Sequence, residues 1–266
     1  MKNNSIRAVA IRIGMGCAIG FGYFIIAISG RSASEGNDLL SQGKELYAIS
    51  CSPCHGINGR GDGPLAHNLK IFPRDLTKGA YKSRSTASGQ LPTDYDLFHT
   101  ITVGIHSQMP GFRGQTLRAR WAIVQYIKIF SDRFTDSSEY PLDTLAFGRQ
   151  IVSSPKSLSR GRMVYLQMRC AECHGSYGRG DGKAAYSQKD DFGNPLHVTD
   201  LTNYSDYKFS RSILDVYRIF STGMNGVPMP SYKDNLTDDD RWNLANYVWA
   251  LQNTDQYPPM ATEAEK

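Results

Sequence analysis

The sequence predicts an all-α protein built from two tandem helical domains and preceded by an N-terminal apolar helix. Three observations support this fold class. The second half of the 266 residues repeats the first at an offset near 119 residues. Apolar side chains in the last predicted helix of each copy follow the i, i+4, i+7 spacing of a single helix face. No stretch alternates apolar and polar residues convincingly enough to predict a strand.

The internal repeat is carried by matched residues that keep their order. The pentapeptides CSPCH (51–55) and CAECH (170–174) lie 119 residues apart. A DLT triplet recurs at an offset of 125, so the second copy has six extra residues before it. Order and spacing hold over roughly 90 residues, which predicts two homologous domains. The other matches are Gly43 with Gly161, Tyr47 with Tyr165, Phe98 with Tyr217, Gly104 with Gly223, Met109 with Met229, Trp121 with Trp242, and Tyr126 with Tyr247.

Both pentapeptides have the pattern C-x-x-C-H of a c-type haem attachment site. Two cysteines at this spacing can bond the two vinyl groups of one porphyrin, and the next histidine is then held over the iron. Two such motifs use four of the five cysteines. A pair of redox or zinc C-x-x-C sites would leave both histidines unexplained. We therefore predict two haem c groups, bound by Cys51, Cys54 and His55 and by Cys170, Cys173 and His174.

A second iron ligand is expected from a later loop that crosses the other face of each haem. Met109 is the only methionine of the first copy after its CxxCH motif, and Met229 matches it in position and in the following proline. They lie 54 and 55 residues after the two histidines, and this agreement favours ligation over simple core packing. Met224 is a rival for Met229, and His106 is a rival for Met109.

Other polar residues are given structural roles. Arg60 and Arg179 match each other and are predicted either to neutralise haem propionates or to lie on a loop surface. Asp75 and Asp200, each followed by Leu-Thr, are predicted to form local hydrogen-bonded turns. We predict no catalytic residue.

Each copy is expected to contain three main helices. The first helix precedes the CxxCH motif, at about Leu39 to Ser50 and Leu158 to Arg169. The middle helix begins after Thr93, which resembles a capping box with Asp96, and its counterpart begins after Ser210. The last helix carries an apolar face formed by Ile123, Ile127 and Phe130 in one copy and by Leu244, Val248 and Leu251 in the other.

The predicted chain has five segments. Residues 1–34 are a signal peptide or an N-terminal membrane anchor, residues 35–132 and 158–253 are the two domains, and residues 254–266 are a tail. The linker, 133–157, is rich in Ser, Asp and Pro and is expected to lie along the surface.

The N-terminal segment indicates export. It has four basic groups, no acidic group and an apolar stretch from Ile13 to Ser29. Positive charge before such a stretch keeps that end in the cytoplasm. Ala27 and Ser29 suit signal cleavage, whereas an uncleaved stretch would be near the short end of the about 17–25 residues that a membrane span needs. Either alternative predicts that the haem motifs lie on the periplasmic side of a bacterial inner membrane.

The formal net charge of +5 does not indicate nucleic-acid binding. Residues 1–34 contribute +4, residues 35–135 contribute +4 and residues 136–266 contribute −3, and no long basic run is present. This asymmetry can instead orient docking with charged partners.

These motifs identify a family resemblance. Each half resembles a class I c-type cytochrome domain, and the whole resembles a tandem dihaem cytochrome c, over about residues 36–132 and 155–253. The resemblance implies that the first and last helices of each domain cross near the haem edge. Gly43, Tyr47 and their counterparts would then lie at that crossing.

The predicted function is electron transfer. His/Met ligation raises the iron potential relative to bis-histidine ligation and fills both axial positions, so each haem should carry electrons without bond chemistry. The expected partners are redox proteins such as a quinol-oxidising complex, a dehydrogenase, or a terminal oxidase or reductase. The alternative is a dihaem peroxidase, which needs one haem with an openable distal position. A haem sensor is a third possibility, but no signalling domain is recognised.

Overall fold

The computed structural model describes residues 31–253, except residues 70, 107, 141 and 209–211. Most of the predicted N-terminal segment, including its apolar stretch, and the predicted tail lie outside the described residues. Among the described helices, none combines the length and the apolar character that crossing a membrane would require.

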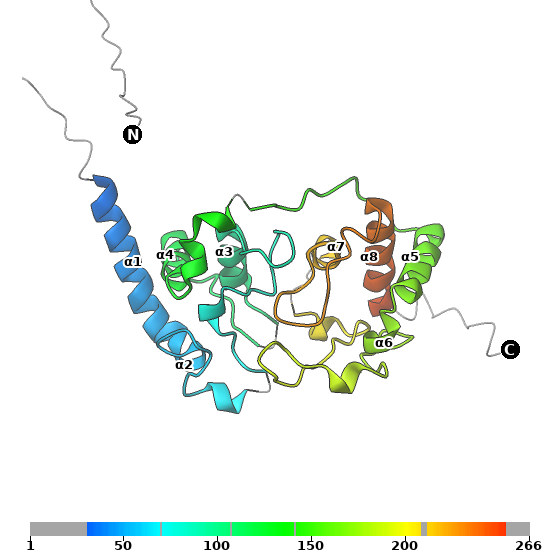
Figure 1. The fold of residues 1–266 in the computed structure, drawn as a ribbon, viewed down its shortest axis with the longest axis horizontal. Coiled ribbons are helices and arrows are strands. Elements are labelled where there is room, and N and C mark those ends of the chain that lie inside the picture. Colours follow the sequence, from blue (N-terminus) through cyan, green and yellow to red (C-terminus); the bar gives the residue numbers. More distant parts are fainter. Residues whose placement is uncertain (1–30, 70, 107, 141, 209–211, 254–266) are drawn as a thin grey trace, which may run out of the picture.

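The described residues are mostly helical and contain isolated β-bridges but no strand, which confirms the all-α prediction. Figure 1 shows the helices of the first half on one side and those of the second half on the other. The α-helices are α1 (Arg31–Ser50), α2 (Ser52–His55), α3 (Asp94–Val103), α4 (Leu117–Lys128), α5 (Pro155–Gln167), α6 (Ala171–His174), α7 (Ile213–Thr222) and α8 (Asp238–Ala250). Short 3₁₀ turns are η1 (Ala66–Asn68), η2 (Leu76–Lys78), η3 (Asp132–Phe134), η4 (Ser137–Glu139), η5 (Ala185–Ser187), η6 (Tyr204–Asp206) and η7 (Leu251–Asn253).

Each half is built around a helix crossing that depends on a glycine. A Cβ at Gly43 of α1 would overlap the Ala122 carbonyl oxygen of α4, and a Cβ at Gly161 of α5 would overlap the Asn243 carbonyl oxygen of α8. Only a residue without a side chain lets the two backbones come this close. The tertiary structure thus has the crossings that the family resemblance implies.

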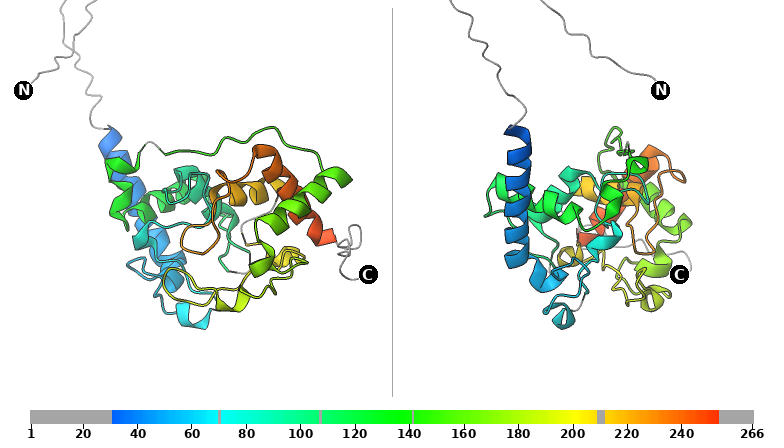
Figure 2. Two further views of the ribbon diagram at one scale, coloured as in Figure 1. Left: turned by 45° about the vertical axis from the view of Figure 1, so that its right-hand side comes forward. Right: turned by 60° about the vertical axis from the view of Figure 1, so that its left-hand side comes forward.

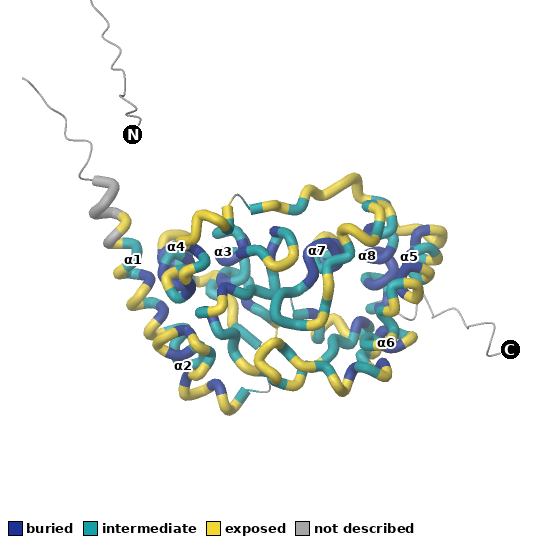
Figure 3. Tube along the Cα trace, viewed as in Figure 1, coloured by how far each residue is buried: buried dark blue, intermediate teal, exposed yellow. Residues whose placement is uncertain are grey.

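Equivalent aromatic pairs strengthen the core of each half. Phe98 stacks on Trp121 with ring centroids 4.5 Å apart, and Tyr217 stacks on Trp242 at 4.2 Å. The buried residues form one hydrophobic cluster in each half. Figure 3 shows buried segments in α4 and α8, both of which contribute to these clusters. The predicted apolar faces belong to these clusters. Ile123 and Ile127 are buried in the first cluster, and Phe130 packs against it. Leu244, Val248 and Leu251 are buried in the second cluster.

The helix boundaries follow the capping chemistry. Thr93 and Asp96 form the expected capping box at the start of α3. The first helix begins at Arg31 and not at Leu39, so it starts within the segment that the sequence assigned to a signal peptide or anchor. The helix α5 ends at Gln167, earlier than predicted, because Arg169 adopts a left-handed conformation with φ of 59°.

The linker is held against both halves. The Asp143 carbonyl oxygen accepts a hydrogen bond from the Ala87 amide at 2.8 Å, and the Leu145 amide donates to the Ser85 carbonyl oxygen at 2.7 Å. Leu142 packs against the first core and Leu145 against the second. The segment crosses from one half to the other along the exposed upper edge of the molecule in Figures 1 and 3.

The buried side chain of Arg84 joins the two halves directly. Its Nη2 donates to the Thr222 carbonyl oxygen at 2.6 Å, at the end of α7, and its Nε donates to the Ala87 carbonyl oxygen of its own half at 3.1 Å. Burial lowers the pKa of Arg84 to about 10, so the guanidinium stays charged at neutral pH. In both views of Figure 2, loops of the first half lie next to loops of the second half.

We expect Arg84→Ala to destabilise the contact between the halves by about 2–3 kcal/mol, because it leaves buried carbonyl groups without a charged donor. Differential scanning calorimetry should then resolve two transitions in place of one cooperative transition. Arg118→Ala, which removes an exposed ion pair with Asp38, is the matched control and should change stability by less than about 1 kcal/mol. Equal effects of the two variants would contradict this role of Arg84.

Candidate functional site

Each half contains a cavity lined by its CxxCH motif and by its Met-Pro loop. The first cavity, of about 420 Å³, is lined by Cys51, Cys54 and His55 and by Met109. The second, of about 190 Å³, is lined by Cys170, Cys173 and His174 and by Met229 and Met224. The structure therefore brings the predicted site residues of each half together.

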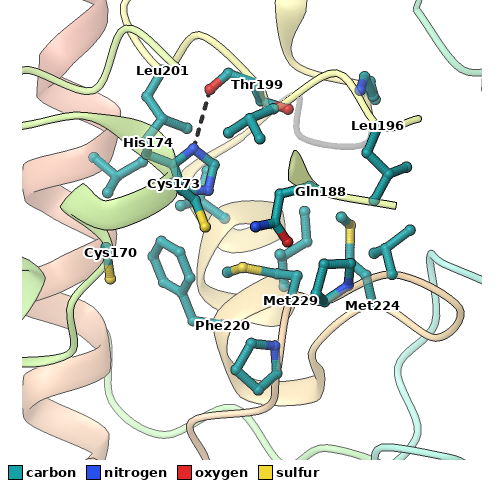
Figure 4. A pocket seen from close by; sticks show the side chains of 18 of the residues that line it. Cys170, Cys173, His174, Gln188, Leu196, Thr199, Leu201, Phe220, Met224 and Met229 are labelled. Carbon is teal, nitrogen blue, oxygen red and sulfur yellow. Dashed lines mark hydrogen bonds between the residues drawn. The ribbon is translucent and has the colours of Figure 1, made fainter. Parts of the chain in front are cut away.

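The two histidines are oriented in the same way. Each ends a single-turn helix that follows the first long helix, and a carbonyl group fixes its ring: His55 Nδ1 donates to the Arg74 oxygen at 3.1 Å, and His174 Nδ1 donates to the Thr199 oxygen at 3.1 Å (Figure 4). A carbonyl oxygen only accepts, so Nδ1 carries the proton and Nε2 keeps its lone pair. Burial lowers the pKa of both imidazoles, which favours this neutral form.

The turn after each histidine is held by a tyrosine from the preceding helix. The hydroxyl of Tyr47 donates to the Gly56 oxygen at 2.8 Å, and that of Tyr165 donates to the Gly175 oxygen at 2.7 Å. Both glycines have positive φ angles, 77° and 80°, so the chain turns sharply away from the histidine. The matched tyrosines thus fix the backbone that positions the ligand, a role that the sequence analysis did not assign to them.

None of the four cysteines of the motifs forms a disulfide bond. Burial, reinforced by the neighbouring Cys54, raises the pKa of Cys51 to about 12, and burial raises that of Cys170 to about 11. The cysteines of each motif line the same cavity as the histidine that follows them. This is the arrangement needed for two covalent bonds to one group placed against that histidine.

The methionine loops are also equivalent. Ile105 N donates to the Met109 oxygen at 2.8 Å, and Met224 N donates to the Met229 oxygen at 2.9 Å, so Met224 occupies the place of Ile105. In Figure 4 the thioether of Met229 points toward Phe220, on the side of the cavity that holds Cys173 and His174, while Met224 lies near Leu196. This correspondence favours Met229, because the first half has no ligating side chain where the second has Met224.

The other five residues that the sequence analysis singled out also have clear locations. His106 is exposed and does not line the first cavity, which makes it a poor rival for Met109. Asp75 Oδ1 accepts from the Thr77 amide at 2.9 Å, and Asp200 Oδ1 from the Thr202 amide at 2.9 Å, which confirms both predicted turns. Arg60 and Arg179 are exposed, and Arg179 lies over the ring of Tyr177.

Residues of the second half complete the cavity of the first half, which sequence reasoning missed. Asp190 and Phe192, from the hairpin between Lys189 and Pro195, line the first cavity together with Leu196, which follows that hairpin. Leu196 and Lys82 line both cavities. The six extra residues of the second copy fall in this region and were the one sign in the sequence that the two halves differ here. The sequence does not show that they pack against the first half.

The donor set of each cavity fits a covalently attached haem. Two thiols and an imidazole with a free Nε2 come from one element, and a thioether comes from a loop that lines the same cavity. Apolar side chains form much of the remaining lining, such as Leu97, Ile101 and Ile127 in the first half and Val216, Phe220 and Val248 in the second.

Comparisons with known proteins agree with this arrangement. The family model described as "Cytochrome c" matches residues 158–252, and the model described as "Cytochrome C oxidase, cbb3-type, subunit III" matches residues 38–127. Two similar curated proteins are cbb3-type cytochrome c oxidase subunits CcoP of Helicobacter pylori. They are 25% and 24% identical over 81% of this chain, which spans 59% of their length.

A solved chain is more similar. It belongs to the reducing HAO-like protein complex of Kuenenia stuttgartiensis, is 40% identical, and aligns over 79% of this chain and 95% of its own length with a TM-score of 0.76. Two c-type family models, one in each half, and this long alignment agree with the paired CxxCH cavities. The chain therefore belongs to the cytochrome c family as a tandem protein, and its two domains bind two haem c groups.

Proposed function

We propose that this protein is an electron-transfer subunit whose two haems have His/Met axial ligation. In the first half Cys51 and Cys54 would form the thioethers, with His55 and Met109 as axial ligands. In the second half the equivalent residues are Cys170, Cys173, His174 and Met229. Domain limits of 35–132 and 158–253, joined by the linker 133–157, are part of this proposal.

One observation carries the proposal: each cavity offers an imidazole and a thioether from two different elements. Bound haem c supplies a one-electron couple at its iron. The residues of this chain anchor the group, exclude water with an apolar lining, and fill both axial positions. A thioether ligand favours the reduced iron and leaves no position for peroxide or oxygen.

The place of the protein in a larger assembly is also proposed. The similar proteins are named as an oxidase subunit and as a chain of a complex, which supports a subunit that exchanges electrons with other redox proteins. Such partners would be a quinol-oxidising complex, a dehydrogenase, or a terminal oxidase or reductase, and the chain itself would not be an enzyme. The basic and apolar N-terminal segment supports a location on the periplasmic side of a bacterial inner membrane, anchored or free after cleavage.

An absorption spectrum of the holoprotein with and without carbon monoxide tests the proposal. We expect two haems, the near-infrared band of a methionine–iron bond, and no spectral change on adding carbon monoxide to the reduced protein. Rapid binding of carbon monoxide, or turnover of peroxide with an electron donor, would instead indicate the dihaem peroxidase alternative. Myoglobin in the same buffer is the positive control for ligand binding.

A further inference from the structure

Three cationic side chains meet where the two cavities adjoin. Arg74 lines the first cavity, Lys208 lines the second, and Lys82 lines both. All three are at least partly buried. Within the described part of the chain, no carboxylate forms an ion pair with any of them. A group of buried cations without paired anions is costly, so it requires an explanation.

Arg74 connects the histidine of the first half with the second half. Its carbonyl oxygen orients His55, whereas its guanidinium lies over the ring of Phe192, 5.7 Å from the centroid. A Cβ at Gly226, in the methionine loop of the second half, would overlap Arg74 Nη1. Both Nη1 and Nη2 are buried and have no hydrogen-bond partner in the structure. Buried guanidinium nitrogens normally have acceptors, so these point to an acceptor supplied by a ligand.

The two lysines share this environment. Burial, followed by the charges of Arg74 and Lys208, lowers the pKa of Lys82 to about 8. Burial also lowers the pKa of Lys208, whose Nζ donates to the His197 carbonyl oxygen at 3.0 Å. Four acids lie near these cations. Asp190 accepts from backbone amides of its own hairpin, Asp75 accepts from the Thr77 amide, and Asp206 accepts from His197 and the Asp200 amide. Asp191 adds a negative charge near Arg74 without forming an ion pair with it.

We propose that Arg74, Lys82 and Lys208 form one anion-binding site, shared by the two cavities, that holds the propionate carboxylates of both haems. Lys82 serves both groups, Arg74 serves the first and Lys208 serves the second. This inference rests on the proposed function only in requiring a haem in each cavity. The sequence analysis considered Arg60 and Arg179 for the propionate contact. Arg60 lines the first cavity but is exposed, and Arg179 does not line the second cavity, so the pair does not supply the same contact in both halves.

The shared position of Lys82 predicts a distinctive redox pattern. A nearby positive charge stabilises the reduced form of a haem, so its removal lowers the potential. Lys82→Gln should therefore lower both midpoint potentials, each by about a threefold to tenfold change in the reduction equilibrium constant, where tenfold is about 59 mV for one electron. Arg74→Gln should lower mainly the potential of the first haem, and Lys208→Gln mainly that of the second.

Spectroelectrochemical titration of the dihaem holoprotein measures these shifts. The exposed Lys78 and Lys183 supply matched controls, and Lys78→Gln and Lys183→Gln should leave both potentials unchanged. Lys82→Arg, which keeps the charge, should retain both potentials and excludes a general packing effect. The wave of each haem is assigned with Met109→His and Met229→His, each of which should shift one of the two waves.

A shift of only one potential, or of neither, in Lys82→Gln would overturn the shared site. The same titration separates this failure from a failure of the proposed function. If the wild-type protein shows two reversible one-electron waves and no carbon monoxide binding, electron transfer stands whatever the lysine variants do. If Lys82→Gln is recovered without its full haem content while Lys82→Arg carries both haems, the charge is required for haem incorporation, which supports the site.

Discussion

Met229→His is expected to lower the midpoint potential of one haem by roughly 0.1–0.3 V, a fraction of the about 0.8 V range that axial ligands cover, and to leave the other haem nearly unchanged. The neutral, soft thioether stabilises reduced iron, and an imidazole in its place does so less. Met109→His should have the same effect on the other haem. Redox titration of each variant, together with loss of half of the near-infrared methionine band, provides the measurement.

Met224→His is the control for this assignment. Met224 lines the same cavity as Met229 but occupies the position of Ile105, which has no ligating atom. Replacing it should leave both potentials and the near-infrared band close to those of the wild type. If Met224→His changed a potential and Met229→His changed neither, Met224 would be the distal ligand of the second haem.

Gly161→Ala should destabilise the second domain by about 3 kcal/mol, and Gly43→Ala should do the same to the first. In each case the new Cβ would overlap a carbonyl oxygen of the crossing helix and approach the Cβ of Tyr247 or Tyr126. Backbone cannot move aside as a flexible side chain does, so the two helices must separate. Thermal unfolding followed by circular dichroism, with haem absorbance as a second signal, measures the loss.

Gly36→Ala is the matched control, since Gly36 lies in the same helix as Gly43 and a Cβ there would meet nothing within 4 Å. This variant should be neutral or more stable by about 0.5–1 kcal/mol, because alanine has the better helix propensity. If Gly43→Ala and Gly36→Ala melted at the same temperature, the close crossing of α1 and α4 would not limit stability.

Features with local or repeated signals could be predicted from the sequence. The CxxCH motifs, the Met-Pro loops and the Thr93 capping box depend on residues close together in the chain. The glycines at the helix crossings could be predicted because the second copy carries a glycine at the matching position. Because each domain packs its own first and last helices, matched positions such as Gly43 and Gly161 indicate contacts that are distant in sequence but occur twice.

The contacts between the domains could not be predicted in this way, because they do not repeat. Arg84 reaches the end of α7, and the hairpin containing Phe192 closes the cavity of the other half. The sequence by itself determined the two haem attachment motifs, the matched methionines and the all-α domains, since these rest on spacing and periodicity. Only the tertiary structure placed Lys82 between both cavities, because the relative position of two domains depends on side chains that meet once, with no local pattern to reveal them.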